Sequence, residues 1–296
     1  MESKVWMITG ASRGIGAEIA RAALAAGHQV VATSRNKESV EKALGGSHER
    51  LLAVSLDVTN PEQANIAVEA AKARFGRIDV LVNNAGYALA GAVEEITLDE
   101  FQKQYDTNVF GLWNVTKAAL PTLRAQRSGH ILNLSSIGGW VGMAGAGAYC
   151  SSKFAIEGLS EALQAELKPL GIHVTIVEPG AFRTDFLESN SMSLSQSTIE
   201  DYAETAGVVR NALSNSSGLQ EGDPKKLSQA LLDIVASDEP PLRLLLGSDA
   251  AQLMEAKLES TRKEFEKWKP VSVSMAFDGE EAGPSLLSQM TSSSSA

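Results

Sequence analysis

The sequence has one cysteine, few aromatic residues and no excess of positive charge, and each shortage excludes a class of protein. Cys150 is the sole cysteine in 296 residues, so an internal disulfide and a cysteine-rich metal site are both impossible. Acidic residues outnumber basic ones by 36 to 26, which gives a formal net charge of −10. General nucleic-acid binders and anionic-membrane binders need a basic face, so neither partner is expected.

The sequence also lacks a long apolar run. No segment approaches the ~20 apolar residues of a membrane span, and the N-terminal MESKVWMITG has no secretory signal pattern. We therefore expect a cytoplasmic protein in a reducing environment. The four histidines show no metal-ligand spacing, so no metal is expected either. The chain does have 44% hydrophobic and 21% charged residues, which is typical of a globular protein with a sizeable core.

Short apolar, β-branched runs alternate with longer helical patterns. Several runs are continuously hydrophobic, as is typical of parallel strands covered on both faces. Repeated β–α units predict a Rossmann-type α/β fold, a doubly wound parallel sheet of about seven strands with helices on both faces. The expected strands are Val5–Thr9, Gln29–Thr33, Leu51–Leu56, Ile78–Val82, His130–Leu134, His173–Val177 and Leu242–Leu246, and the expected helices are Gly14–Ala26, Pro61–Phe75, Asp99–Leu120, Ala148–Leu170 and Pro224–Ala236.

The alternation stops in two places. Residues 184–222 are rich in serine and asparagine, and such a long connection at a strand end is often a lid over a ligand. A plain surface insertion is the alternative. After Trp268 the periodicity ends, and the final QMTSSSSA lacks the apolar content to order itself. We predict a single domain over residues 1–270, with 184–222 as its lid, and a tail over 271–296 whose last part is disordered.

A glycine-rich turn follows the first expected strand. The run Gly10-Ala11-Ser12-Arg13-Gly14-Ile15-Gly16 opens a helix. Glycine lets the backbone approach a pyrophosphate, whose charge then meets the N–H groups at the helix start. The spacing is G-x-x-x-G-x-G, which differs from the G-x-G-x-x-G dinucleotide fingerprint. A tight β–α turn without a ligand would look the same.

The second expected strand leads into Ser34 and Arg35, where an NAD enzyme usually has a carboxylate for the ribose 2′-hydroxyl. Arg13 projects from the glycine turn toward the same end of the sheet. Two guanidinium groups and a hydroxyl suit a 2′-phosphate, so this end of the site favours NADP(H) over NAD. The alternative is that both arginines are solvated surface residues.

Tyr149 and Lys153 lie four residues apart in an expected helix, so their side chains share a face. A free phenol has a pKa of about 10, and a neighbouring ammonium favours the phenolate and lowers that value. The pair would therefore suit proton transfer near neutral pH. Taken alone, the spacing equally describes a packed tyrosine and a surface lysine. Cys150, with no histidine nearby in sequence, is interpreted as a helix filler.

Other polar and glycine motifs follow successive expected strands, at the edge where ligands bind in open α/β sheets. The complete set is TGASRGIG (9–16), Asp57, NNAG (83–86), Asn108 in TNVFG, Ser136 in LSS, YCSSK (149–153) and EPGAFRT (178–184). In this order the motifs closely resemble those of the short-chain dehydrogenase/reductase family, in its single-domain branch. The resemblance covers roughly residues 4–250.

The resemblance implies an NADP(H)-dependent oxidoreductase that moves a hydride between the nicotinamide and a carbonyl or alcohol carbon. Tyr149 would be the general acid in reduction and the base in oxidation. Ser136 would hydrogen-bond the substrate oxygen. Lys153 would hold the nicotinamide ribose and lower the Tyr149 pKa, and Asn108 would position a water in a proton relay to Lys153.

The resemblance also assigns the dinucleotide contacts. Asp57 and the Val58 backbone match adenine contacts, and residues 180–184 match the clamp on the nicotinamide carboxamide. Asn83 and Thr9 are expected to be structural, tying neighbouring strand ends together. The residues expected to bind the dinucleotide are Gly10, Ser12, Arg13, Gly14, Ile15, Gly16, Ser34, Arg35, Asp57, Val58, Asn84, Ala85, Gly86, Tyr149, Lys153, Pro179, Gly180, Phe182 and Thr184.

The loops expected around the nicotinamide are apolar, aromatic or small, at residues 87–89, 137–144 and 186–194. They predict a neutral, hydrophobic ketone, aldehyde or secondary alcohol as substrate, although lid packing alone would give the same composition. The resemblance implies a homo-oligomer, a dimer or tetramer built on helices 99–120 and 148–170. The expected substrate pocket contains Ser136, Trp140, Met143, Tyr149 and Phe186.

Two other functions are compatible with the fold. A non-catalytic NADP-binding sensor or scaffold needs only the phosphate half of the site, so the joint presence of Asn108, Ser136, Tyr149 and Lys153 argues for an enzyme. Isomerases and dehydratases that resemble this family usually carry a G-x-x-G-x-x-G turn and a larger C-terminal domain. Neither feature is found here.

Overall fold

The computed structural model of the chain describes residues 2–46, 48–187, 191–275 and 277. It separates into two compact units, residues 1–251 and 252–296. The first unit contains the sheet and every predicted site residue. Residues 289–296, which were predicted to be disordered, lie outside the described residues.

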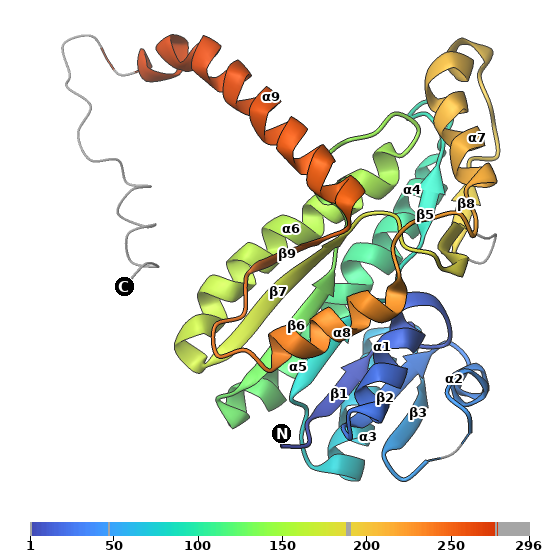
Figure 1. Ribbon diagram of the computed structural model, residues 1–296, viewed down its shortest axis with the longest axis vertical. Coiled ribbons are helices and arrows are strands. Elements are labelled where there is room, and N and C mark those ends of the chain that lie inside the picture. Colours follow the sequence, from blue (N-terminus) through green and yellow to red (C-terminus); the bar gives the residue numbers. More distant parts are fainter. Residues whose placement is uncertain (1, 47, 188–190, 276, 278–296) are drawn as a thin grey trace. The chain divides into compact units, whose positions relative to one another are not determined.

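Seven parallel strands form the sheet of the first unit (Figure 1). The chain runs outward from β1 in both directions, because β1 pairs with β2 on one side and with β4 on the other. Ligands bind at such a switch point in open α/β sheets. The order β3-β2-β1-β4-β6-β7-β9 confirms the predicted doubly wound fold, with strand ends shifted by at most two residues. The strands are β1 (Val5–Ile8), β2 (Gln29–Ser34), β3 (Leu51–Ser55), β4 (Val80–Asn83), β6 (Gly129–Leu134), β7 (Ile172–Pro179) and β9 (Arg243–Leu246).

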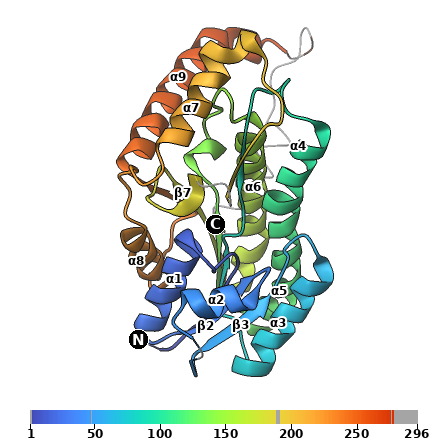
Figure 2. The same ribbon diagram turned by 90° about the vertical axis from the view of Figure 1, so that its right-hand side faces the viewer.

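Helices cover both faces of the sheet (Figures 1 and 2). One core joins the sheet to α3 (Pro61–Phe75), α5 (Gly111–Gln126) and α6 (Gly147–Leu167). The other core joins it to α1 (Gly14–Ala25) and α8 (Pro224–Val235). Both predicted proline starts are confirmed, since Asn60 and Asp223 cap α3 and α8 immediately before their first-turn prolines.

The prediction of one continuous helix over Asp99–Leu120 is wrong. The segment consists of α4 (Leu98–Tyr105), a π-helical turn (Asp106–Phe110) and α5. The prediction also stopped before Pro121, which lies inside α5. Leu123 beyond it is fully buried, and this packing outweighs the lost backbone hydrogen bond.

Several elements have no counterpart in the prediction. Two three-residue parallel strands, β5 (Ala88–Ala90) and β8 (Met192–Leu194), pair with each other, and strands this short carry no detectable periodicity. The short helices α2 (Lys37–Ala43) and α7 (Val208–Asn215) and the long helix α9 (Ser248–Val273) were also missed. None of the helices in the described ranges is long and apolar enough to cross a membrane.

Candidate active site

The glycine turn follows β1 and leads directly into α1. Gly10 has a φ of 66°, and a Cβ there would lie 3.0 Å from the Ala85 Cα. Arg13 precedes α1 in the N-cap position but gives it no side-chain cap, and the first turn of α1 has no acidic residue. The backbone N–H groups at this helix start therefore suit a phosphate, so the turn fits a dinucleotide.

Asn84 connects the end of β4 to the glycine turn. Its Nδ2 donates to the carbonyl oxygens of Thr9 at 2.9 Å and Gly10 at 3.2 Å. The Thr9 hydroxyl in turn accepts from the Asn84 and Ala85 amides, both at 3.0 Å. Asn83 donates to side chains on α5 and β6. The predicted structural roles of Thr9 and Asn83 are thereby confirmed.

The end of β2 carries hydroxyl and guanidinium groups and no carboxylate. The Ser34 hydroxyl donates to the Asn36 carbonyl at 2.7 Å, and Arg35 is exposed. The Arg13 Nε donates to the Ser191 hydroxyl at 3.0 Å, on the predicted lid. Asp57, at the neighbouring strand end, accepts from the Thr59 amide and hydroxyl through Oδ1.

Residues 180–184 lie over the same edge of the sheet, after β7. The Asp249 carboxylate accepts from the Ala181 amide at 2.7 Å, and a Cβ at Gly180 would collide with that carboxylate. Thr184 lies next to Gly14, since a Cβ built on Gly14 would be 3.8 Å from the Thr184 Cβ. The clamp segment and the glycine turn are therefore brought together, and Asp249 is a supporting residue that the sequence did not reveal.

The predicted reacting residues come from two elements. Tyr149 and Lys153 lie on the first two turns of α6, and Ser136 follows β6 and caps a short 3-10 turn, Ile137–Gly139. The Ser136 hydroxyl lies beside the Tyr149 ring, since a Cβ built on Gly138 would be 3.5 Å from the Ser136 Oγ and 3.3 Å from the Tyr149 Cε1. It also accepts from the Gly138 amide at 3.1 Å. The Lys153 Nζ lies 5.6 Å from the centroid of the Tyr149 ring. The structure therefore gathers these three side chains.

Comparison with known proteins identifies the family. Residues 4–194 match the family model for short chain dehydrogenases. The chain belongs to the short-chain dehydrogenase/reductase family. It is 42% identical to oxidoreductase BOA17 of Botryotinia fuckeliana, over 93% of this chain and 100% of that protein. It is 40% identical to 3-ketodihydrosphingosine reductase of Bacteroides thetaiotaomicron, over 88% of this chain and 93% of that protein. The crystal structure of a short-chain dehydrogenase from Streptomyces avermitilis has a TM-score of 0.86 at 41% identity, covering 94% and 100% of the two chains.

This short-chain dehydrogenase is thus an oxidoreductase of alcohol or carbonyl groups that uses a nicotinamide cofactor, NAD or NADP. Its acidic, cysteine and histidine side chains form no group of three or more suited to a metal ion within the described residues.

The electrostatics of Tyr149 differ from the prediction. Burial raises the pKa of Tyr149 to about 12, and the hydrogen bond with Ser136 only partly opposes this rise. The Lys153 ammonium lies over the Tyr149 ring and donates to the Leu134 carbonyl at 2.7 Å, and its lowering of the Tyr149 pKa stays a prediction. Burial also lowers the pKa of Lys153 to about 8, against the opposing effect of the Glu157 carboxylate.

Asn108 is a buried residue of the π-helical turn between α4 and α5. Its amide side chain accepts from the Tyr87 amide at 3.1 Å and donates to the Tyr87 carbonyl at 3.0 Å. It also donates to the Ser152 hydroxyl at 3.1 Å. The Asn108 side chain thus connects Tyr87, the residue before β5, to α6 one residue before Lys153. Its role in a water relay stays a prediction.

The predicted lid segment is attached to the site at several points. Phe186 lies beside Tyr149, with ring centroids 6.2 Å apart. Strand β8 extends the segment along β5, and a buried ion pair between Glu95 and Arg210 holds its later part. No sequence motif pointed to that pair, because its two members are separated by 115 residues. Met143, another predicted pocket residue, is half-buried.

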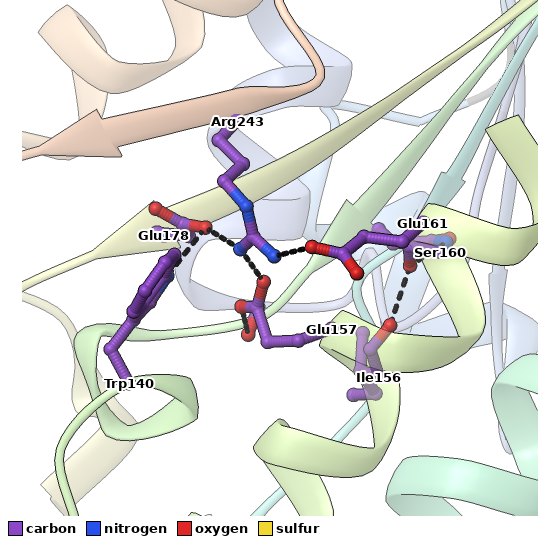
Figure 3. A network of polar contacts seen from close by, with 9 residues as sticks. Trp140, Ile156, Glu157, Ser160, Glu161, Glu178 and Arg243 are labelled. Atoms are coloured by element: carbon purple, nitrogen blue, oxygen red, sulfur yellow. Dashed lines mark hydrogen bonds and ion pairs between the residues drawn. The ribbon is translucent and has the colours of Figure 1, made fainter. Parts of the chain in front are cut away.

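Trp140, a predicted pocket residue, contacts charged side chains of β7 and β9, and its place in a substrate pocket stays a prediction. Its indole Nε1 donates to the Glu178 carboxylate at 3.0 Å, and the Arg243 guanidinium lies 4.5 Å from its ring centroid (Figure 3). The indole N–H and one face of the Trp140 ring therefore both contact an ion-pair cluster. The sequence could not show this, because the contact depends on β9 pairing beside β7.

Proposed function

We propose that this chain is an NADP(H)-dependent carbonyl reductase or alcohol dehydrogenase that acts on a neutral, hydrophobic substrate, with Tyr149 as its general acid and base. The observation that carries the proposal is the convergence of Ser136, Tyr149 and Lys153 beside the glycine turn and the 180–184 clamp. A binding scaffold would need only the turn.

Bound NADP(H) would supply the hydride in reduction and accept it in oxidation. The Ser136 and Tyr149 hydroxyls bind and orient the substrate oxygen, and the two side chains lie together around Gly138. In reduction, Tyr149 donates its proton to that oxygen as the carbon–hydrogen bond forms. In oxidation the phenolate takes the proton back. The high Tyr149 pKa keeps the phenol protonated for reduction.

Lys153 provides the positive charge next to the phenol. One of its three N–H groups is used by the Leu134 carbonyl, and the other two can hold the ribose hydroxyls of the dinucleotide. With the ammonium at the ring face, any phenolate formed at Tyr149 in oxidation is stabilised electrostatically. Lys153 would therefore help both to bind the dinucleotide ribose and to transfer the Tyr149 proton.

The cofactor preference rests on the end of β2. Ser34 and Arg35 stand where a carboxylate would select NAD, and Arg13 extends from the glycine turn to the lid residue Ser191. A 2′-phosphate placed between these groups would form charge-assisted hydrogen bonds. This composition supports NADP(H) over NAD.

The substrate class rests on the apolar surroundings of Tyr149. The Phe186 ring lies 6.2 Å from the Tyr149 ring, centroid to centroid, and Met143 is half-buried in the loop before α6. The relative from Bacteroides is named as a reductase of a keto compound, 3-ketodihydrosphingosine. We infer a hydrophobic ketone, aldehyde or secondary alcohol as the substrate here.

The test follows loss of NADPH absorbance, then NADH absorbance, with a panel of apolar and charged carbonyl compounds. Turnover of apolar carbonyls with NADPH is the expected result. Turnover only of charged acids would overturn the substrate class, and preference for NADH would overturn the cofactor assignment. Tyr149→Phe separates an enzyme from a scaffold, since an enzyme loses nearly all turnover while still binding NADPH.

A further inference from the structure

Four charged side chains from α6, β7 and β9 form a cluster next to the proposed active site (Figure 3). Arg243 on β9 pairs with Glu157 and Glu161 on α6, and with Glu178 on β7. The contacts to Glu161 and Glu178 measure 2.5 Å and 2.7 Å. Glu157 and Glu178 are almost fully buried, whereas the Glu161 side chain is 56% exposed. We call these four residues the Arg243 cluster.

The two buried carboxylates of the cluster hold both ends of the loop that carries Ser136. Glu157 accepts from the hydroxyl of Ser135, the residue immediately before Ser136. Glu178 accepts from the Trp140 indole at 3.0 Å, where the 3-10 turn capped by Ser136 ends. The loop also packs directly on Glu157, because a Cβ at Gly139 would lie 2.7 Å from its Oε1.

The cluster also reaches the reacting residues along α6. Tyr149, Lys153 and Glu157 follow one another at intervals of four residues, so they form a row on one helix face. The charge of Glu157 acts on the Lys153 ammonium and favours its protonated form. Arg243 in turn favours the ionised form of Glu157, while burial and Glu178 disfavour it. Arg243 is therefore linked to Lys153 through one carboxylate.

We propose that Arg243 is a positioning residue for the reaction, acting through Glu157 and Glu178. It fixes the loop 135–140 that presents Ser136, and it maintains a negative charge one helical turn from Lys153. This inference rests on the proposed function, because it assigns a purpose to contacts around Ser136, Tyr149 and Lys153. Without Arg243, two buried carboxylates would face each other and one would take up a proton.

The expected pH effect follows from the charges around Glu157 and Lys153. Glu157 faces Lys153 and Glu161 on its own helix, Glu178 on β7 and Arg243 on β9. Burial and the Glu178 carboxylate raise the Glu157 pKa, and Arg243 opposes that rise, so loss of Arg243 favours the neutral form of Glu157. Lys153 then loses its counter-charge, and its pKa falls further below its ordinary value.

Lys153 itself faces the Tyr149 ring and Glu157 on α6 and the Leu134 carbonyl of β6. Cys150, beside Tyr149, is the other titratable group on that helical turn, and burial raises its pKa. Burial raises the pKa of Tyr149 and Cys150 and lowers that of Lys153 to about 8, so Lys153 is expected to lose its proton first. The alkaline limb of carbonyl reduction therefore reports on Lys153.

The test compares Arg243→Gln and Glu157→Gln in the full chain with a carbonyl substrate and NADPH. Both variants are expected to lower kcat on the order of 10²-fold, as small misplacements of reacting groups do. The KM for NADPH should change by less than about twofold, because the phosphate half of the site is untouched. The alkaline limb of kcat/KM should move to lower pH by about one unit in both variants.

Two substitutions serve as matched controls. Arg77→Gln removes an arginine from another ion pair, with Asp79, and Glu69→Gln removes an exposed glutamate paired with Lys72. Both should keep the native kcat and pH profile. Glu157→Gln retains an oxygen that can accept from Ser135, so it changes the charge while preserving the shape of the site.

A shifted alkaline limb in Glu157→Gln supports the proposal even if Arg243→Gln fails to fold. An unshifted limb in a folded Glu157→Gln that binds NADPH normally overturns it. The proposed function fails separately, if Tyr149→Phe keeps its turnover. An inactive Tyr149→Phe together with a native profile in both cluster variants would reject only the role of Arg243.

Discussion

Glu95 and Arg210 form an ion pair in which the two side chains are only 2% and 15% exposed. The Glu95 carboxylate also accepts from the backbone amides of Ala92 and Ile199, both at 2.8 Å. One carboxylate thus joins the segment after β5, the lid segment after β8, and α7. Such a buried charge is stable only while all of its partners are present.

We expect Glu95→Gln to lower the thermal midpoint of the chain by several degrees, because it leaves the Arg210 guanidinium buried without a counter-charge. The backbone hydrogen bonds, followed by Arg210, hold the pKa of Glu95 below its usual range. Its stabilising contribution is therefore complete above the ordinary pKa and is lost as pH falls through the lowered value. Thermal melts between pH 7 and pH 3 measure this. Glu94→Gln, at an exposed pair with Tyr202, is the control and should melt like the native chain.

Removal of the Ser136 hydroxyl should reduce catalysis without reducing cofactor binding. Ser136→Ala is expected to lower kcat on the order of 10²–10³-fold, since a preorganised donor to the substrate oxygen is lost. NADPH affinity, measured by fluorescence titration, should remain native. Ser151→Ala removes a hydroxyl that donates to the Ala148 carbonyl within α6, and it should retain full activity. Equal losses in both variants would contradict the assigned role.

Arg35 should distinguish the two dinucleotides. Arg35→Ala is expected to raise the KM for NADPH by roughly 10–100-fold, corresponding to a lost charge-assisted hydrogen bond. The KM for NADH should change by less than about twofold, because NADH has no 2′-phosphate. Arg74→Ala is the control, because Arg74 is an exposed arginine in the last turn of α3. A parallel loss with both cofactors would show that Arg35 does not read the phosphate.

Stability should increase with pH where Lys153 loses its proton. Its pKa is lowered to about 8 in the folded chain and is 10.5 for the ordinary side chain, so between these values the unfolded chain binds more protons. The unfolding free energy should therefore rise from pH 8 to pH 10.5, by up to about 3 kcal/mol from this group. Urea denaturation of the native chain and of Lys153→Met measures the difference. Parallel curves for the two proteins would contradict the lowered pKa.

The homo-oligomer implied by the family resemblance would use exposed aromatic residues on or beside α5 and α6, and a charge placed there should weaken it. Phe110, Trp113 and Phe154 are each about half exposed, on or beside the helices expected to form the interface. Trp113→Glu should shift the chain toward monomer in light scattering coupled to size exclusion, because a charge is costly in an apolar interface. Leu219→Glu, at an exposed leucine in the segment before α8, should leave the mass unchanged. A native chain that is already monomeric would reject the proposed oligomer.

The strand pattern was predictable because it is a local property of the chain. Buried parallel strands need continuous apolar runs, and β1 and β4 are buried along their whole length, as the runs predicted. The motif residues were predictable for a related reason. Glycine at position 10 and the four-residue interval between Tyr149 and Lys153 are demanded by local backbone geometry, so they can be recognised without knowing the fold.

The amino-acid sequence by itself determined the fold class, the glycine turn and the choice of the three side chains proposed to react. Only the tertiary structure decided what surrounds them: that Arg243 reaches Glu157 and Glu178, that Trp140 belongs to this cluster, and that burial raises the Tyr149 pKa. The reason is physical. Periodicity and motif spacing record interactions between near neighbours, whereas burial and ion pairing depend on which distant segments the sheet order places side by side.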